Sequence, residues 1–146
     1  MRFFYLLSLL LVASCISDPR SPEAALKDFI DSGVGKVVTR DFVLQRVTGK
    51  MLVSFENMAE EDFAKFADMR NIKAESFKVL SKSCQQKTCF LTYSVGYLTK
   101  KDDKTVFTSE IKKIAEVIEV DKKWLISDIS NIKTYHEALE PISPLE

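Results

Sequence analysis

The hydrophobic pattern changes its period near residue 72, and this change constrains the fold more than any other feature of the sequence. Between residues 21 and 70, apolar side chains recur three to four positions apart, as on one face of a helix. From Ile72 onward, apolar and polar side chains alternate, as in strands that bury one face. The sequence therefore predicts helices first and strands second, in one α+β domain.

The first half of the chain contains four expected helical segments. Ser21, Pro22 and Glu23 supply a hydroxyl cap, a proline at the first helical position and an acid in the first turn, so a helix should begin here and end near Gly33. Thr39 is expected to cap a short second segment. Ranges 50–58 and 59–70 each carry an apolar stripe at helical spacing, so we expect two more helices there.

The second half is expected to form antiparallel strands separated by turns at residues 102–104 and 121–123. In the long strand 105–120 the apolar positions change phase between Ile111 and Ile114, and a β-bulge near Lys112 and Lys113 would reconcile them. The predicted fold class is therefore α+β, with N-terminal helices packed on a curved antiparallel sheet of four or more strands.

Cys84 and Cys89 are separated by four residues, a length suited to a hairpin loop. Residues that close such a loop face each other, so a disulfide between them is expected in an oxidising compartment. The alternatives are a pair of free thiols, or a redox or metal site. A structural zinc needs four ligands, and His136 is the one histidine in the chain, so no metal and no cofactor are expected.

The first fifteen residues have the form of a secretory signal, with one charge at Arg2, an apolar run over residues 3–12 and two small residues before Cys15. A spanning helix needs about 20 apolar residues. Polar residues from Ser17 onward arrive too soon for that, so a permanent transmembrane anchor is not expected. The leader is compatible with an ordinary cleaved signal, in which Cys15 has no role, and with a signal that precedes attachment of a lipid to Cys15.

Val12, Ala13, Ser14 and Cys15 resemble the recognition site of bacterial lipoproteins. The resemblance implies a diacylglycerol on the Cys15 sulfur, cleavage before Cys15 and an acyl chain such as palmitate on the new amino terminus. It divides the chain into a signal peptide (1–14), a lipidated cysteine with a short linker (15–21), one domain (22–136) and a frayed tail (137–146). Ile16 follows the cysteine where aspartate favours inner-membrane retention, so the expected location is the periplasmic face of the outer membrane.

Residues 21–135 together resemble the nuclear-transport-factor-2-like (cystatin-like) domain of many small bacterial lipoproteins. The resemblance rests on SPEAALKDFI, CFLTYSVGY and IKKIAEVIEVDKKWLISDI. It implies a cone-like shape that is open at one end, and a short early strand near residues 34–38. The family's enzymes place acids, histidines or tyrosines inside the cone. The corresponding candidates for a ligand pocket here are Tyr93, Tyr97, Phe107, Trp124 and Asp128, although the tyrosines suit core or rim positions equally well and Asp128 suits an outward-facing one.

The charge pattern argues against nucleic-acid binding, and the absence of a group of catalytic residues argues against enzymatic activity. The chain carries 21 basic and 21 acidic residues, and the lysines of its second half are interleaved with acids, so no nucleic-acid partner is expected. No serine, cysteine and histidine grouping suggests nucleophilic catalysis, so the chain is not expected to be an enzyme.

The expected function is that of a noncatalytic envelope lipoprotein, attached to the membrane by its lipid, whose domain binds a protein or peptide partner. The alternative is a small-ligand carrier or cavity enzyme that uses the open end of the cone. An open cavity of about 300 Å³ or more, with Asp128 or a tyrosine hydroxyl at its base, would favour the alternative. A cone filled by aromatic side chains, among them Phe29, Phe55, Phe63 and Trp124, would favour partner binding.

Overall fold

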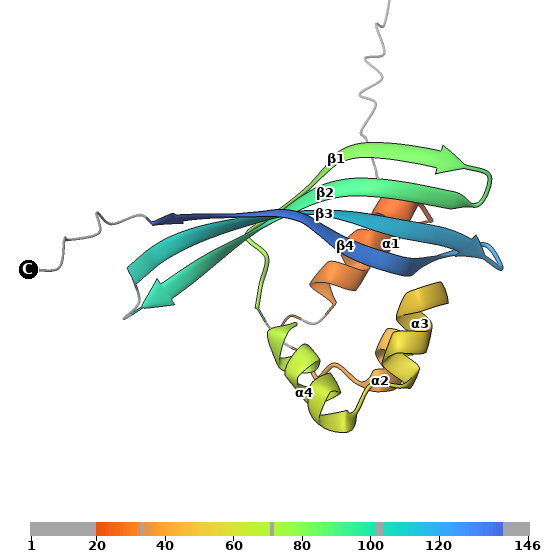
Figure 1. Ribbon diagram of the computed structural model, residues 1–146, viewed down its shortest axis with the longest axis horizontal. Helices are drawn as coiled ribbons and strands as arrows, with labels where there is room; N and C mark the ends of the chain where they lie inside the picture. The colour runs from red at the N-terminus through yellow and green to blue at the C-terminus, as the bar shows by residue number, and fades with distance from the viewer. Residues whose placement is uncertain (1–19, 33, 35, 71, 102–103, 139–146) are drawn as a thin grey trace, which may run out of the picture.

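A computed structural model describes residues 20–138 except Gly33, Gly35, Asn71, Asp102 and Asp103 (Figure 1). Within the strands, the side chains of residues 99–101, 104–107 and 138 lie outside this description. The chain forms helices first and then a single sheet, so the predicted α+β class is confirmed.

The helical half contains α1 (Pro22–Asp31), α2 (Arg40–Leu44), α3 (Gly49–Glu56) and α4 (Glu60–Met69). The two predicted caps are present. Ser21 Oγ accepts a hydrogen bond from the Ala24 amide at 3.1 Å, and Thr39 Oγ1 accepts one from the Phe42 amide at 3.3 Å. Each cap satisfies a backbone donor that the first turn of a helix leaves unpaired.

The sheet half contains β1 (Ser76–Gln85), β2 (Thr88–Lys101), β3 (Lys104–Val120) and β4 (Lys123–Ala138), in the order β1-β2-β3-β4 with antiparallel neighbours. Two-residue turns join β1 to β2 and β3 to β4. Asp121 and Lys122 both adopt positive φ angles, 50° and 64°, between β3 and β4. That backbone matches the twist of the flanking strands.

The β-bulge expected in β3 near Lys112 and Lys113 lies in the neighbouring strand instead. The β2–β3 register runs without a shift past both lysines, whereas the β3–β4 register shifts between them because Ile132 of β4 is an extra residue. β3 therefore keeps one phase, and Lys113 lies on the same face as the buried Ala115.

The short early strand expected near residues 34–38 is absent from the described residues of that range. A single parallel bridge forms later, between Val47 and Ile126. The Thr48 amide donates to the Ile126 carbonyl and the Ile126 amide donates to the Arg46 carbonyl, both at 2.9 Å. This segment covers part of the free edge of β4.

The four helices of the described residues all lie on one side of the sheet, and none of them lies on the opposite side (Figure 1). Helix α1 contacts β3 and β4, and α3 contacts β4. One core cluster joins the two layers; its buried members include Leu26, Phe29, Phe55, Phe63, Leu91, Tyr93, Ala115, Val117 and Ile126. At one end, β2, β3 and β4 continue past the helices (Figure 1). None of the described helices is long and apolar enough to cross a membrane.

Candidate functional site

Tyr93 and Tyr97 line one cavity on the helical side of the sheet, and the other pocket candidates lie elsewhere. Trp124 lines a surface groove of about 510 Å³ beside the start of α1, which contains neither Asp128 nor a tyrosine. Asp128 lies in a depression with Phe90 and Ile114, and the Lys50 ammonium is 3.4 Å from its carboxylate. The side chain of Phe107 is outside the described residues. The structure therefore brings the two tyrosines together, without the carboxylate.

The position of Asp128 follows from a second register shift. Val117 pairs with Ile126 and Glu116 pairs with Asp128, so Ser127 is an extra residue in β4. An extra residue reverses the face to which the following side chains point. Ile126 is buried in the core, whereas Asp128 lies opposite Glu116 on the other face.

The inner cavity is a space of about 80 Å³ between α1, α4 and the sheet. Its polar lining is contributed by Arg70, which follows α4, by Tyr93 and Tyr97 of β2 and by Lys113 of β3. Its apolar lining is Phe29, Ile30, Met69, Ile72, Val95 and Ile129. The sequence patterns gave no reason to select Arg70 or Lys113. The alternation of Ile111, Lys113 and Ala115 would have placed Lys113 on the inner face, had a bulge not been expected at that point of the strand.

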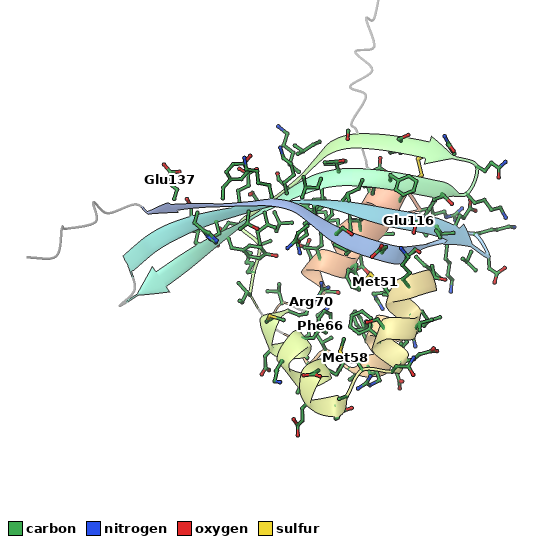
Figure 2. The ribbon with its side chains drawn as sticks, viewed as in Figure 1. Met51, Met58, Phe66, Arg70, Glu116 and Glu137 are labelled. Carbon is green, nitrogen blue, oxygen red and sulfur yellow. A yellow bond between two sulfur atoms is a disulfide. The ribbon has the colours of Figure 1, made fainter. Side chains whose placement is uncertain are left out.

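Arg70 is held at the inner cavity by aromatic contacts. Its guanidinium carbon lies 4.3 Å from the centroid of the Phe29 ring and 5.7 Å from that of Phe66, an arrangement that favours the cation. One of its N–H groups donates to Ser32 Oγ at 3.2 Å. In Figure 2, Arg70 and Phe66 lie close together between α4 and α3, with the sheet above them.

The polar groups of the inner cavity have shifted pKa values. Burial lowers the pKa of the Lys113 ammonium, and the charge of Arg70 lowers it further. Burial also raises the pKa of the Tyr93 and Tyr97 phenols, so both hydroxyls remain protonated at neutral pH. The cavity thus presents two cations and two neutral hydroxyls.

A second hollow, the outer groove, lies on the opposite face at the end of the sheet that extends past the helices. Its volume is about 280 Å³. Ser76, Gly96, Glu110 and Tyr135 form one cross-strand row along it. Leu98 adds apolar surface, and Glu75 and Glu137 add two more carboxylates. Glu137 marks this end of the sheet in Figure 2. A Cβ at Gly96 would collide with the Ser76 hydroxyl, so glycine keeps the floor of the groove low.

The next cross-strand row on the same face of the sheet is basic. Lys78 pairs with Ser94, Ser94 with Lys112, and Lys112 with Lys133. The lining of the outer groove itself includes three glutamates and no lysine or arginine. The groove is therefore locally acidic, and a basic row borders it.

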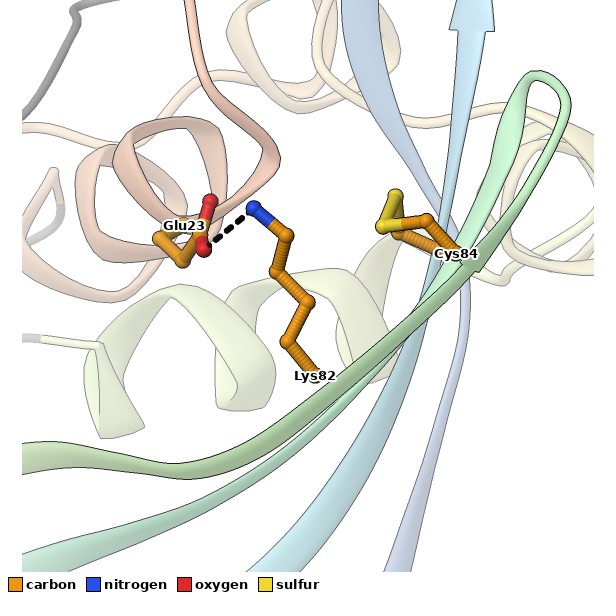
Figure 3. Close-up of a disulfide and its surroundings, with 4 residues drawn as sticks. Glu23, Lys82 and Cys84 are labelled. Carbon is orange, nitrogen blue, oxygen red and sulfur yellow. Dashed lines mark hydrogen bonds and ion pairs between the residues drawn. A yellow bond between two sulfur atoms is a disulfide. The ribbon is translucent and has the colours of Figure 1, made fainter.

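A disulfide joins Cys84 and Cys89, which are direct partners across the β1–β2 hairpin with Cα atoms 4.1 Å apart. Beside it, the Lys82 ammonium donates to the Glu23 carboxylate at 2.6 Å and so links β1 to α1 (Figure 3). Both features tie the edge strand β1 to the rest of the domain.

His136, the one histidine of the chain, lies within β4. Its Nδ1 atom is 2.8 Å from Ser109 Oγ on the neighbouring strand, and the pair is exposed. Among the residues that the structure describes, no group of three or more histidine, cysteine, aspartate or glutamate side chains is placed to hold a metal ion. No protein-family model, curated protein or solved structure matches the chain.

Proposed function

We propose that this chain is a noncatalytic envelope lipoprotein, anchored through Cys15, whose domain binds a protein partner in the outer groove. One observation carries the choice of binding over catalysis, namely the filling of the helical side of the sheet. Phe29, Phe55 and Phe63 are 3%, 5% and 4% exposed there. The space left beside the tyrosines, about 80 Å³, is well below the roughly 300 Å³ of small-molecule sites.

The anchor and the family likeness belong to the same proposal. Cys15 lies outside the described residues, and the apolar leader with its small-residue site supports lipidation. Helices that precede a four-stranded meander, register shifts that bend strands and a face covered by helices support a cone-like domain related to nuclear transport factor 2. Only a short linker separates Cys15 from α1, so the domain would lie close to the bilayer.

We infer that the partner contributes an extended segment that carries lysine or arginine. Glu75, Glu110 and Glu137 line the outer groove, and within the described part of the chain none of them forms an ion pair. Leu98 is 37% exposed in the same groove, so aliphatic stems of basic side chains can pack there while their charges meet the carboxylates. Tyr135 is 46% exposed, and the Lys133 ammonium of this chain lies 4.6 Å from the centroid of its ring. The basic row that borders the groove would repel lysine or arginine, so the basic part of the segment should not extend beyond the groove.

Site-specific crosslinking in intact cells tests this proposal. A photoreactive phenylalanine analogue at Leu98 should yield an adduct with one envelope protein, and the crosslinked peptide should be rich in lysine or arginine. The matched control places the analogue at Val53, which is 58% exposed on α3. Charge reversal by Glu110→Lys with Glu137→Lys should abolish the Leu98 adduct, whereas Glu56→Lys with Glu61→Lys should preserve it. An adduct that survives reversal in the groove, or the same adduct from Val53, would refute the proposed surface.

A further inference from the structure

We propose that the inner cavity binds a carboxylate group, held between the Arg70 guanidinium and the Lys113 ammonium. The inner cavity and the outer groove lie on opposite faces of the sheet and share one lining residue, Tyr97, so this inference does not depend on the outer groove. Three features of the cavity support it: donors without protein acceptors, two cations without an ion pair, and apolar lining residues beside them.

The first observation is a set of donors without protein acceptors. Among the described residues, the Lys113 ammonium and the Tyr93 and Tyr97 hydroxyls form no hydrogen bond. Tyr93 is 1% exposed. Arg70 donates to Ser32, and a guanidinium carries five N–H groups, so donors of Arg70 remain. These polar atoms are not fully enclosed, because Glu23 Oε2 is the one fully buried side-chain atom without a partner among the described residues, but all of them border one common space.

The second observation is uncompensated positive charge. Neither Arg70 nor Lys113 forms an ion pair with a carboxylate in the described part of the chain. Asp31 is near enough to affect Arg70, but its carboxylate is bonded to Lys27 on the exposed side of α1. Two partly buried cations repel each other, and an anion between them adds two attractions that outweigh this repulsion.

The third observation selects the kind of anion. Ile30, Val95 and Ile129 form apolar walls beside the donors, and about 80 Å³ accommodates only a few non-hydrogen atoms. A carboxylate directs its two oxygens toward donors and leaves its carbon side against apolar walls. A phosphate would press charged oxygens against those walls without hydrogen bonds, at a cost in free energy.

Titration with sodium acetate at constant ionic strength, adjusted with sodium chloride, tests the assignment. Amide resonances of full-length protein in detergent micelles should shift saturably at Tyr97 and Lys113. Lys113→Met should weaken acetate binding by about tenfold or more, because a hydrogen bond to a charged group is lost. Lys112→Met is the matched control, since the adjacent lysine lies on the other face, and it should leave the affinity within about twofold. Equal effects of the two variants, or no saturable shift, would overturn the proposal.

Tyr97→Phe provides a test that hardly alters the shape of the cavity. It removes one hydroxyl and should weaken acetate binding several-fold, and an unchanged affinity would count against the site. Inorganic phosphate should bind more weakly than acetate, and tighter phosphate binding would overturn the choice of a carboxylate. A Gly-Glu-Gly peptide with blocked termini identifies which kind of molecule supplies the carboxylate. Tighter binding than acetate assigns the site to an acidic side chain, and exclusion of the peptide assigns it to a small free acid.

Discussion

The Lys82 ammonium lies 2.6 Å from the Glu23 carboxylate, so an ion pair joins the edge strand β1 to the first turn of α1. Burial raises the pKa of Glu23, but the hydrogen bond and charge of Lys82, with local backbone and Ser21 hydrogen bonds, lower it to a net value below 4.5. A carboxyl group whose pKa falls on folding stabilises the native state above its unfolded pKa. That contribution is lost as the pH falls through the folded pKa.

Glu23→Gln should lower the free energy of unfolding at neutral pH by a few tenths to about 1 kcal/mol, because both partners are partly exposed. The difference from the unaltered protein should shrink as the pH falls from 4.5 through the lowered folded-state pKa, because the carboxyl group then becomes protonated in the folded state as well. Urea unfolding at about pH 7 and about pH 3 measures this. Glu61→Gln, on the exposed side of α4, is the control and should have little effect at either pH. A Glu23→Gln effect that is equal at both values would contradict the role of the ion pair.

Reduction of the Cys84–Cys89 disulfide should lower the free energy of unfolding by about 2 kcal/mol, because the bridge closes a short loop. Denaturant unfolding with and without a thiol reductant provides the measurement. Cys84→Ala with Cys89→Ala should make stability insensitive to the reductant. Sensitivity that persists in this double variant, or full thiol labelling of both cysteines in native protein, would refute a structural disulfide.

The inner-cavity tyrosines predict an alkaline loss of stability. Burial raises the folded-state pKa of Tyr97 above its ordinary value of 10.0, so the neutral phenol stabilises the native state below about pH 10. That stability is lost as the pH rises and the unfolded phenol ionises. Tyr97→Phe should therefore flatten the decline of stability above about pH 10, as followed by unfolding curves and phenolate absorbance. An unchanged slope would contradict a buried phenol at this position.

Local signals were sufficient for the helix starts and for the cysteine pair. Ser21 and Thr39 cap helices because a hydroxyl before a helix satisfies nearby amides, a relationship that spans three residues. Cys84 and Cys89 meet because residues 86–87 form a two-residue turn, which makes Gln85 and Thr88, and then the two cysteines, cross-strand partners.

Strand phase was not predictable from one strand alone. The apolar pattern of β3 suggested a bulge in β3, but the extra residues are Ser127 and Ile132 of β4, and their effect depends on pairing between strands. Because the extra residues lie in β4, the alternation of β3 is unbroken and Lys113 faces the helices. The extra residue Ser127 turns Asp128 to the opposite face. Arg70 joins the inner cavity through α1 and α4 packing, which no local periodicity encodes.

The proposed lipid anchor would determine where the domain works, and the mature amino terminus tests it. Mass spectrometry of the N-terminal peptide from the membrane fraction should show a chain that begins at Cys15 with a diacylglycerol on the sulfur, and Cys15→Ser should release the protein from the detergent phase. A mature chain that begins at another residue, or an unmodified Cys15 on a protein that partitions into the aqueous phase, would contradict a membrane-anchored envelope module.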